Sequence, residues 1–591
     1  MDNQRLFLWI GLAAILFLNY EVWQRDYARP AATTETAQSA AASRVSGAPA
    51  APGAVGGPAK GLADSLPSVS APPPAALAGP ASAASTAGGA APTAAAAPAA
   101  DAGVGTPAAT PIVHVHTDVL DLEIAMRGGE LRRVDLLRYP QKKDAPNVPV
   151  RLLNSDSPES LFVFQGGLTS GGNGPEPNHM ATFTATATSY TLGPSEAELL
   201  VPLRWSDGAG LTVTRTYRFT PGGYAIGLAH KVENAGAVTW RGRAYGQLLR
   251  QWQTVERSMW DPSTYAFKGP AIYDGRKYQK LDVEKPDPQA LPKSALTGGW
   301  VAAMQHHFVA AIVPAADEAY EYALAVKDRE FLLRATGPER SVAPGGSAEF
   351  RQTLFVGPKL QAQLEAAGAE LDRTADYGKY LTVIARPLFW LLSFVHRGVG
   401  NWGWTIILVT LLIKLAFYPL AQTSGRSMAK MRSIGPRMKA IQERYKDDRA
   451  ALGQQMMELY KREKVNPLAG CLPIVVQIPV FISFYWVLLE SVELRQAPWM
   501  LWVQDLSTRD TLFILPALMG ASMFAQFKLN PAPPDPMQAK VFAFMPLVMT
   551  VMMAFFPAGL VLYWITNTVF SIAQQWRINK IVESEEKKAR A

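Results

Sequence analysis

The chain has 591 residues with a single cysteine, 48% of its residues are hydrophobic, and its formal net charge is +8. This length exceeds that of one ordinary domain, so the chain divides into regions of different character. The lone Cys471 excludes an intramolecular disulfide, and any part outside the cytoplasm must fold without one. No glycine-rich phosphate loop is present, so the sequence offers no motif for nucleotide hydrolysis.

The N-terminal segment, residues 1–29, predicts an uncleaved transmembrane anchor. Residues 6–18 carry no charge, and residues 6–23 are just long enough to cross about 30 Å of hydrocarbon. A cleaved signal peptide is the alternative, because a run of this length also fits its apolar region. No cleavage site of small residues follows closely, which favours the anchor.

The next two regions lie before the last third of the chain. Residues 30–111, which we call the linker, are almost wholly Ala, Pro, Gly, Ser and Thr. They bury too little apolar surface to offset chain entropy, so a disordered tether is predicted. Residues 112–373 alternate apolar and polar residues in short stretches, such as 211–219, between turn clusters such as 221–223. This pattern predicts a large, mainly antiparallel, all-β sandwich domain.

Two histidine pairs, His114/His116 and His306/His307, raise the question of a metal site. Alternation along a strand puts the first pair on one face, yet no cysteine or third histidine lies near in sequence. We therefore expect no metal ion and no other cofactor. Both pairs are interpreted as solvent-facing strand residues.

The last third of the chain is typical of a multi-pass membrane protein. Residues 374–400 combine apolar residues with arginine and histidine, which predicts an amphipathic helix at the membrane interface. The core region, residues 401–577, contains five candidate spans. They are residues 402–421, 470–489, 511–527, 541–556 and 559–576. With the N-terminal anchor, we predict a polytopic α-helical bundle of six transmembrane helices.

Charge sets the expected orientation of these spans. The loop at residues 422–464 carries 11 Lys and Arg against 5 Asp and Glu, whereas residues 490–510 carry two basic residues against four acids. By the positive-inside rule, the first loop is cytoplasmic and the second lies outside. Both termini, including the basic tail at residues 578–591, are then cytoplasmic, and the β-domain is periplasmic.

Polar residues interrupt the predicted spans. Lys414 lies about 18 Å along its helix from the outer end, and an intramembrane cation is a candidate functional residue. The alternative is a lysine that snorkels to the inner interface. The other polar residues that we single out in the spans are Thr410, Gln477, Gln526, Tyr563 and Asn567, and Tyr563, Asn567 and Ser571 recur at steps of four on one helical face. An unpaired cation among neutral polar groups favours a hydrated groove over interhelical hydrogen bonds that only hold the bundle together.

The loop at residues 422–469 predicts a cytoplasmic helical hairpin with an apolar seam, because apolar residues recur at steps of three and four. Gly435 and Pro436 are expected to split its first arm. The seam contains Met428, Met431, Met438 and Met456. Methionine adapts to varied apolar partners, so these side chains either receive such partners or pack the two arms together.

Distinctive stretches cover nearly all of the last 200 residues. They include GNWGWTIILVTLLIKLAFYPL (400–420), MMELYKREKVNPLAGCLPIVVQIPVF (456–481), SVELRQAPWMLWVQDLS (491–507) and FPAGLVLYWITN (556–567). The stretches TDVLDLEIAMRGGEL (117–131) and GGWVAAMQHHF (298–308) lie in the β-region. Together these stretches resemble the YidC family of membrane protein insertases, in its long Gram-negative form.

The resemblance implies a β-supersandwich similar to galactose mutarotase, and a groove among the five core spans that opens to cytoplasm and lipid. The cationic groove residue of the family, usually Arg, falls on Lys414, which lacks the planar donor fork of Arg. Positions that contact the inserted proteins, here called clients, fall on Tyr563 and Trp564. The implied activity is insertion, folding and assembly of integral inner-membrane proteins, alone or with the Sec translocon, without enzymatic catalysis.

The partners implied by the resemblance are nascent integral membrane proteins, the Sec translocon with its accessory subunits, the translating ribosome and the lipid bilayer, and no DNA. Two other functions are considered: a secondary transporter that uses the intramembrane lysine, and a membrane-anchored sugar-active enzyme. A transporter should show paired halves and an acidic coupling site, which the sequence lacks. Five further spans with polar interiors disfavour the enzyme.

Overall fold

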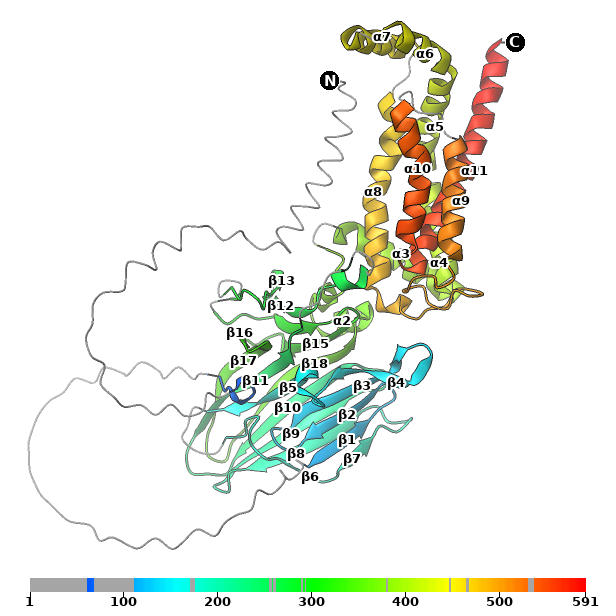
Figure 1. Ribbon diagram of the computed structural model, residues 1–591. Coiled ribbons are helices and arrows are strands. Elements are labelled where there is room, and N and C mark those ends of the chain that lie inside the picture. Colours follow the sequence, from blue (N-terminus) through cyan, green and yellow to red (C-terminus); the bar gives the residue numbers. More distant parts are fainter. Residues whose placement is uncertain are drawn as a thin grey trace, which may run out of the picture.

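The chain is described by a computed structural model over residues 61–67, 111–170, 176–253, 258, 262–287, 291–292, 294–378, 381–445, 448–463, 467–529 and 536–590. The anchor predicted at residues 1–29 and most of the linker lie outside these residues. A β-sandwich and a helical part are stacked end to end (Figure 1). The helices α6 (Gly435–Arg444) and α7 (Arg449–Arg462) lie at the end of the helical part opposite the sandwich.

The β-sandwich consists of two nine-stranded sheets. The first sheet has the strand order β16 (Glu321–Lys327), β17 (Glu330–Val342), β11 (Trp240–Gln251), β5 (Phe162–Thr169), β3 (Glu130–Lys142), β2 (Leu120–Ala125), β1 (Ile112–His116), β7 (Ser189–Thr191), and β4 (Ala145–Leu153) pairs with β3. The second sheet has the order β13 (Tyr278–Lys280), β12 (Gly269–Tyr273), β14 (Trp300–Met304), β15 (Phe308–Pro314), β18 (Ser347–Pro358), β10 (Ala225–Asn234), β9 (Leu211–Phe219), β8 (Leu199–Ser206), β6 (Thr184–Ala185).

All named strand pairs are antiparallel except β1 with β7. Alternate residues of a strand point to opposite faces, so residues such as Val213 and Tyr217 of β9 enter the core between the sheets, while their neighbours do not. The predicted all-β, mainly antiparallel sandwich is confirmed. This part of the chain also contains short helical elements: η2 (Pro158–Ser160), η3 (Pro262–Tyr265), α2 (Gln361–Ala367) and η5 (Leu371–Thr374).

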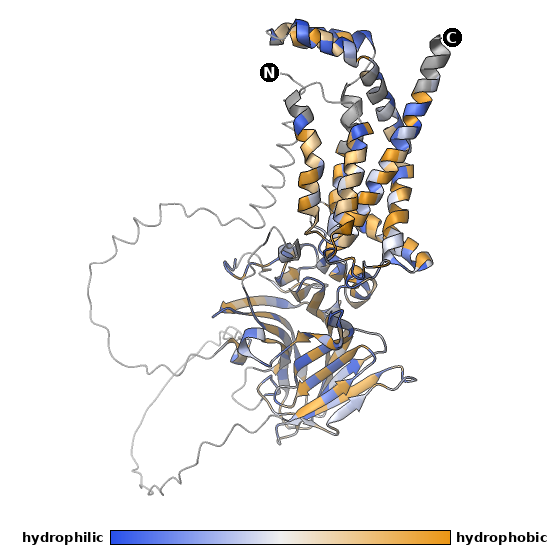
Figure 2. Ribbon diagram, turned by 45° about the vertical axis from the view of Figure 1, so that its right-hand side comes forward, coloured by the Kyte–Doolittle hydropathy of each residue, from blue (hydrophilic) through white to orange (hydrophobic). Residues whose placement is uncertain are grey.

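The helical part follows the sandwich in sequence. Its elements are α3 (Thr382–Val399), α4 (Trp402–Ala416), α5 (Tyr418–Ser433), α6 (Gly435–Arg444), α7 (Arg449–Arg462), α8 (Pro467–Glu490), η6 (Val492–Leu494), α9 (Ile514–Leu529), α10 (Pro536–Met553) and α11 (Ala558–Arg590). Helix α11 packs against α4 and α9, and α8 packs against α3 and α5. Hydrophobic residues dominate the helices between the sandwich and the α6–α7 end (Figure 2).

The helices differ from the predicted spans in two places. The span predicted at residues 402–421 is not one straight helix, because α4 ends at Ala416 and α5 runs at 63° to it. Pro419 explains the break, since proline lacks an N–H and disfavours helical geometry in the residue before it. The basic tail is not separate from the last predicted span, because α11 continues without interruption to Arg590.

A helix can cross a membrane only if it is long enough and apolar enough. Among the described residues, no single helix is both long and apolar enough to pass, whereas the bent pair α4 and α5 passes as a unit. Three shorter apolar helical stretches lie at Val475–Glu490, Ile514–Leu529 and Lys540–Met553.

The hairpin predicted at residues 422–469 is formed by α5, α6 and α7. The chain divides between Ser433 and Gly435, as the Gly435-Pro436 pair predicted. Helix α7 begins after Asp448, whose side chain accepts hydrogen bonds from the backbone N–H groups of Ala450 and Ala451. This N-cap fixes the point at which the chain starts the returning arm.

Polar groups join the sandwich to the end of α8. His306, in the turn between β14 and β15, contacts the carbonyl oxygen of Leu489 at 3.0 Å and the carboxylate of Glu490 at 3.9 Å. Lys359, at the end of β18, is 1% exposed and Glu490 is 2% exposed. Burial lowers the pKa of Lys359 to about 8, and the charges of Glu490 and Asp376 oppose this shift. The junction is therefore a buried, charged contact between the two parts.

We expect Glu493→Gln to stabilise this junction at pH 8 and to have little effect near pH 4.5. Burial raises the pKa of Glu493 in η6 to about 7 from 4.5, so the folded state holds its proton more tightly. A raised carboxyl pKa makes its contribution to stability largest below pH 4.5 and progressively lost as pH rises to 7. Glutamine cannot ionise, so the gain should be about 3 kcal/mol at pH 8.

Thermal unfolding of the full chain in detergent at both pH values measures this effect. Glu365→Gln, which changes an exposed carboxylate on α2, is the matched control and should leave the pH dependence intact. An equal effect of Glu493→Gln at both pH values would contradict the expectation.

Candidate functional site

Polar side chains from three helices meet around Lys414. Its Nζ atom donates to the Oγ atom of Ser571 on α11 at 2.8 Å and to Oε1 of Gln477 on α8 at 3.4 Å. The Gln477 Nε2 atom in turn donates to Oδ1 of Asn567 on α11. We call Lys414, Gln477, Asn567 and Ser571 the lysine cluster. No carboxylate among the described residues forms a salt bridge with Lys414.

The sequence of α11 accounts for half of the cluster. Asn567 and Ser571 are four residues apart, which places them one above the other on one helical face. Ser571 also donates to the carbonyl oxygen of Asn567 at 2.7 Å, so its lone pairs remain available to the lysine. The spacing of Tyr563, Asn567 and Ser571 was the available signal for this face. Ser571, the closest partner of Lys414, was not among the predicted site residues.

Aromatic residues continue the α11 face toward the sandwich. The ring of Tyr563, which is 2% exposed, stacks on Phe484 of α8 with centroids 4.2 Å apart. Trp564 is half-buried and meets Phe481 of α8 edge to face at 4.8 Å. The α8 and α11 contact is thus polar near Lys414 and aromatic on the side nearer the sandwich, so one helix pair offers both kinds of surface.

Two further predicted site residues, Thr410 and Gln526, lie outside both the lysine cluster and the aromatic contact. Thr410 is buried, and its hydroxyl donates to the carbonyl oxygen of Ile406 in its own helix at 2.6 Å. The hydrogen-bonding capacity of its hydroxyl is therefore used within its own helix. Gln526 of α9 is half-buried, and none of the hydrogen bonds within the cluster reaches it. The structure brings together Lys414, Gln477 and Asn567 of the predicted set.

The hairpin methionines occupy different environments. Met438 is 5% exposed in a small apolar cluster with Ile434, Leu459 and Tyr460, and Met431 and Met456 pack against that cluster. The Met428 side chain lies outside the described side chains. Met431 of α5, Met438 of α6 and Met456 of α7 therefore meet in one small apolar cluster.

The histidine interpretation was wrong for one pair. His114 and His116 are exposed strand residues, facing Glu123 and Asp121 across the β1–β2 pair. His306 and His307 instead lie in the β14–β15 turn, with stacked rings 3.8 Å apart at the junction with α8. The sequence could not place this turn against a helix 180 residues later. Among the described residues, no three potential metal-ligating side chains come together.

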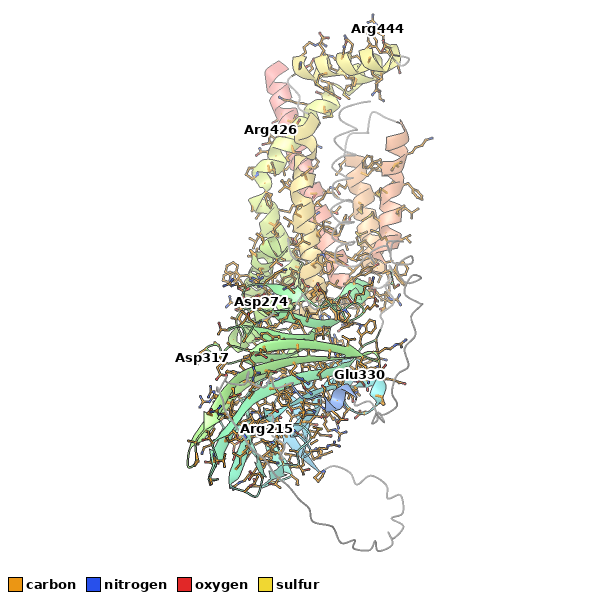
Figure 3. All side chains as sticks on the ribbon, turned by 90° about the vertical axis from the view of Figure 1, so that its left-hand side faces the viewer. Arg215, Asp274, Asp317, Glu330, Arg426 and Arg444 are labelled. Atoms are coloured by element: carbon orange, nitrogen blue, oxygen red, sulfur yellow. The ribbon has the colours of Figure 1, made fainter. Side chains whose placement is uncertain are left out.

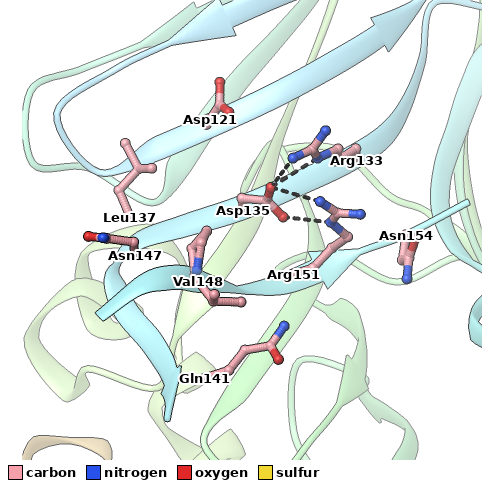
Figure 4. Close-up of a pocket in the computed structure, with 10 residues that line it drawn as sticks. Asp121, Arg133, Asp135, Leu137, Gln141, Asn147, Val148, Arg151 and Asn154 are labelled. Carbon is pink, nitrogen blue, oxygen red and sulfur yellow. Dashed lines mark hydrogen bonds and ion pairs between the residues drawn. The ribbon is translucent and has the colours of Figure 1, made fainter. Parts of the chain in front are cut away.

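A polar cavity of about 460 Å³ lies on β2, β3 and β4 (Figure 4). The buried carboxylate of Asp135 accepts hydrogen bonds from Arg133 at 2.6 Å and from Arg151 at 2.8 Å. Both oxygens of this carboxylate are therefore held by guanidinium groups. The arrangement links three strand positions through paired charges.

Comparison with known proteins finds matches for both the sandwich and the helical part. Residues 112–391 match the family model described as YidC periplasmic domain, and residues 394–586 match the model described as 60Kd inner membrane protein. A protein of Nitrosococcus oceani named membrane protein insertase YidC is 44% identical, covering 99% of this chain and all of that protein. Proteins of the same name from Methylococcus capsulatus and Pseudomonas putida are 47% and 40% identical, covering 81% and 100% of this chain and 87% and 100% of their own lengths.

Two solved structures show weaker likeness. A crystal structure of active YidC insertase with its first transmembrane domain resolved has a TM-score of 0.34 and 16% identity, covering 78% of this chain and 94% of that chain. A galactose mutarotase-like protein from Lactobacillus casei has a TM-score of 0.28 and 8% identity, covering 42% and 99%. Membership rests on the sequence matches over both parts. The chain belongs to the YidC family of membrane protein insertases.

Proposed function

We propose that this chain inserts proteins into the inner membrane, with the lysine cluster as the polar contact for the client and the aromatic face of α8 and α11 as its apolar contact. The observation that carries this proposal is the convergence of Lys414, Gln477, Asn567 and Ser571 from three helices. In lipid, such groups need protein or water partners, and a cation without a carboxylate partner attracts acidic groups.

The outer surface of the helical part supports a lipid environment. Apolar side chains on one helix, α10, are exposed between Val541 and Met552, including Phe544 at 60%, Leu547 at 56% and Val551 at 54%. Exposed apolar surface of this extent marks contact with a membrane or a partner protein. We assign it to lipid, with the helices α4, α8, α9, α10 and α11 as five core spans and residues 6–23 as a sixth.

The helical arrangement suggests how insertion proceeds. The polar tail of a client enters beside Lys414, while its apolar segment moves along Phe481, Phe484 and Trp564 into lipid. Transfer of the apolar segment into lipid is favourable by about 0.8 kcal/mol per CH₂ group, which supplies the driving force. The lysine cluster lowers the barrier for the polar tail because it replaces part of the lost hydration. The translating ribosome and the Sec translocon are the proposed partners that deliver clients.

The experiment that tests the function is reconstitution of the full chain into phospholipid vesicles. A short client with one apolar segment is synthesised in their presence, and insertion is measured by protection of its translocated tail from added protease. Protection that depends on the chain is expected, and protection equal to that in empty vesicles would contradict the function. A secondary transporter or a sugar-active enzyme would give no client protection.

We expect Arg444 to be protected from external protease in intact spheroplasts, while the β-sandwich is digested. Arg444 and Arg426 lie at the end of the helical part away from the sandwich (Figure 3), and the basic excess of this loop favours the cytoplasm. Immunoblotting with antibodies to both parts measures the cleavage. External cleavage at Arg444 would overturn the proposed orientation, in which both termini are cytoplasmic and the sandwich is periplasmic.

The hairpin methionines give a separate prediction about client contact. Replacing Met428, Met431 and Met438 with leucine keeps their volume, so the hairpin should lose less than about 1.5 kcal/mol per site. Leucine lacks the adaptability of methionine, so insertion of varied clients should fall by more than this loss explains. The measurements are hydrogen exchange of the hairpin and insertion of several clients. Met552→Leu on α10 is the control, and proportional losses would support packing alone.

A further inference from the structure

The first sheet has an apolar row on the face that points away from the sandwich core. Leu249 of β11 lies opposite Val163 of β5 and opposite Leu332 of β17 in the strand register. All three side chains are at most 3% exposed, but they form a cluster separate from the core between the sheets. Their strand neighbour Leu248 belongs to that core, as alternation requires. The row is therefore covered by something other than the second sheet.

A segment of the linker covers this row. Residues 61–67 are described, and within them the turn η1 (Leu62–Asp64) packs Leu62 and Ala63 against the apolar row. The segment is 45 residues away from the first residue of β1, in a region otherwise of low sequence complexity. Leu62 and Leu66 are among the few large apolar residues of the linker, and Leu62 is the one that enters the cluster.

A polar row beside the apolar row holds the end of the segment. Two residues along the same strands, Gln247 donates to Gln165 at 2.8 Å, and Arg334 donates through Nε to Gln247 at 2.8 Å. The Nη2 atom of Arg334 remains for the segment and donates to the backbone oxygen of Ser65 at 2.6 Å and to its Oγ atom at 2.9 Å. A buried guanidinium that the sheet holds in place thus donates hydrogen bonds to both a main-chain oxygen and a hydroxyl oxygen.

A histidine holds the middle of the segment. The Nε2 atom of His179 lies 2.9 Å from the carbonyl oxygen of Ala63, and its Nδ1 atom lies 2.5 Å from the hydroxyl of Tyr245. The carbonyl can only accept, so Nε2 carries the proton, and Nδ1 accepts from the tyrosine hydroxyl. Burial lowers the pKa of His179, which keeps this neutral tautomer in place at physiological pH.

We propose that this outer face of β5, β11 and β17 is a binding site for a short peptide, and that its resident ligand is the chain's own residues 62–65. The ligand class is a peptide with an apolar side chain for the Val163, Leu249 and Leu332 row, a small residue next to it, and a hydroxyl residue three positions after the apolar one. A cavity of about 320 Å³ remains beside Asp64, so the site is larger than its resident ligand.

Docking has a consequence for the linker. The segment binds the same domain whose first strand is β1. Residues 68–110 therefore connect two points on the sandwich. Only residues 30–60 then separate the N-terminal anchor from its first contact with the β-domain. Release of the segment would lengthen this connection, and a second peptide of the same class would bind in its place.

The test is hydrogen exchange of the full chain in phospholipid nanodiscs, measured by mass spectrometry. The backbone N–H groups of Asp64 and Ser65 are hydrogen-bonded within the turn, so they should exchange at least about tenfold more slowly than those of the flanking linker peptides. Leu62→Asp and Arg334→Ala should each abolish this protection. Arg241→Ala, which removes an exposed arginine of β11, should not change it.

A binding measurement completes the test. A fluorescent peptide with the sequence of residues 58–69 should bind the Leu62→Asp full chain at least about tenfold more tightly than the wild-type chain, where the tethered segment competes at high effective concentration. Because Leu62→Asp alters only the linker, unchanged exchange of β5, β11 and β17 verifies the fold. The proposal is overturned if residues 62–65 exchange as fast as their flanks in the wild-type chain, or if the peptide binds neither chain.

Discussion

Replacing Lys414 with alanine should slow the insertion of clients with acidic translocated tails by on the order of tenfold. A client carboxylate about 8 Å from the Lys414 ammonium gains about 2 kcal/mol at an effective dielectric constant of about 20, and alanine removes this attraction. Clients with neutral tails should be affected less, because they gain only hydration from the cluster. Lys414→Arg keeps the charge and should retain function. The measurement is insertion of matched acidic and neutral clients into vesicles that contain each variant.

The snorkelling alternative makes a different prediction for the same residue. If Lys414 served only as an interfacial anchor, a lysine one turn nearer the cytoplasm would restore insertion in the Lys414→Ala, Tyr418→Lys double variant. The 63° bend after Ala416 puts Tyr418 on a different helix axis from Lys414, so rescue is not expected. Full rescue, or equal slowing of acidic and neutral clients, would rule out the electrostatic role.

Replacing Lys359 with methionine should lower the free energy of unfolding by about 3–5 kcal/mol, because it leaves Glu490 buried without its main counter-charge. Glu490 is 2% exposed, and its remaining basic neighbours are His306, at 3.9 Å, and Lys280. The loss should appear at the junction of the sandwich with α8. Denaturant unfolding measures the stability, and hydrogen exchange at the β14–β15 turn and in η6 locates the change.

A double variant separates the charge effect from a loss of packing. In Lys359→Met with Glu490→Gln, neither side chain carries a buried charge, so most of the lost stability should return. Lys285→Met, an exposed lysine in the second sheet's connecting loop, is the control and should change little. If the double variant is no more stable than Lys359→Met alone, charge pairing does not hold the junction.

The sequence predicts the two parts of this chain because each has one dominant period. Alternation at residues 211–219 is reproduced in the buried and exposed positions of β9. The hairpin is reproduced because apolar steps of three and four, with Gly435 and Pro436 between them, leave few other arrangements. The bend after Ala416 was missed because hydrophobicity continues through it, although Pro419 was the available signal.

Long-range contacts explain why the site was only partly predicted. Lys414 and Asn567 could be found as polar residues in apolar helices, but their meeting depends on the packing of α4, α8 and α11. Ser571 could be predicted only as part of the polar face that it shares with Tyr563 and Asn567, and the packed helices show it to be the closest partner of Lys414. The position of His306 could not be predicted, because its contact with Leu489 joins residues that are 183 positions apart.

The docked linker segment shows how composition can hide a local signal. Residues 30–111 lack the apolar content of a folded region, and that average predicted a tether throughout. A short segment needs no core of its own when another domain supplies one. Leu62, followed by Ala63 and then Ser65, matches the spacing of the apolar row, His179 and Arg334, which only the folded sheet brings together.

Site-specific photocrosslinking during translation tests the central claim most directly. A photoreactive amino acid is placed at Ser571, at Trp564, or at the exposed Trp390 of α3, and a ribosome stalled on an acidic-tailed client is added to vesicles that contain the chain. The account predicts client crosslinks from Ser571 and Trp564 while the tail is in transit, and weaker ones from Trp390. Crosslinks from Trp390 as strong as those from Ser571, or none from Ser571, would contradict it.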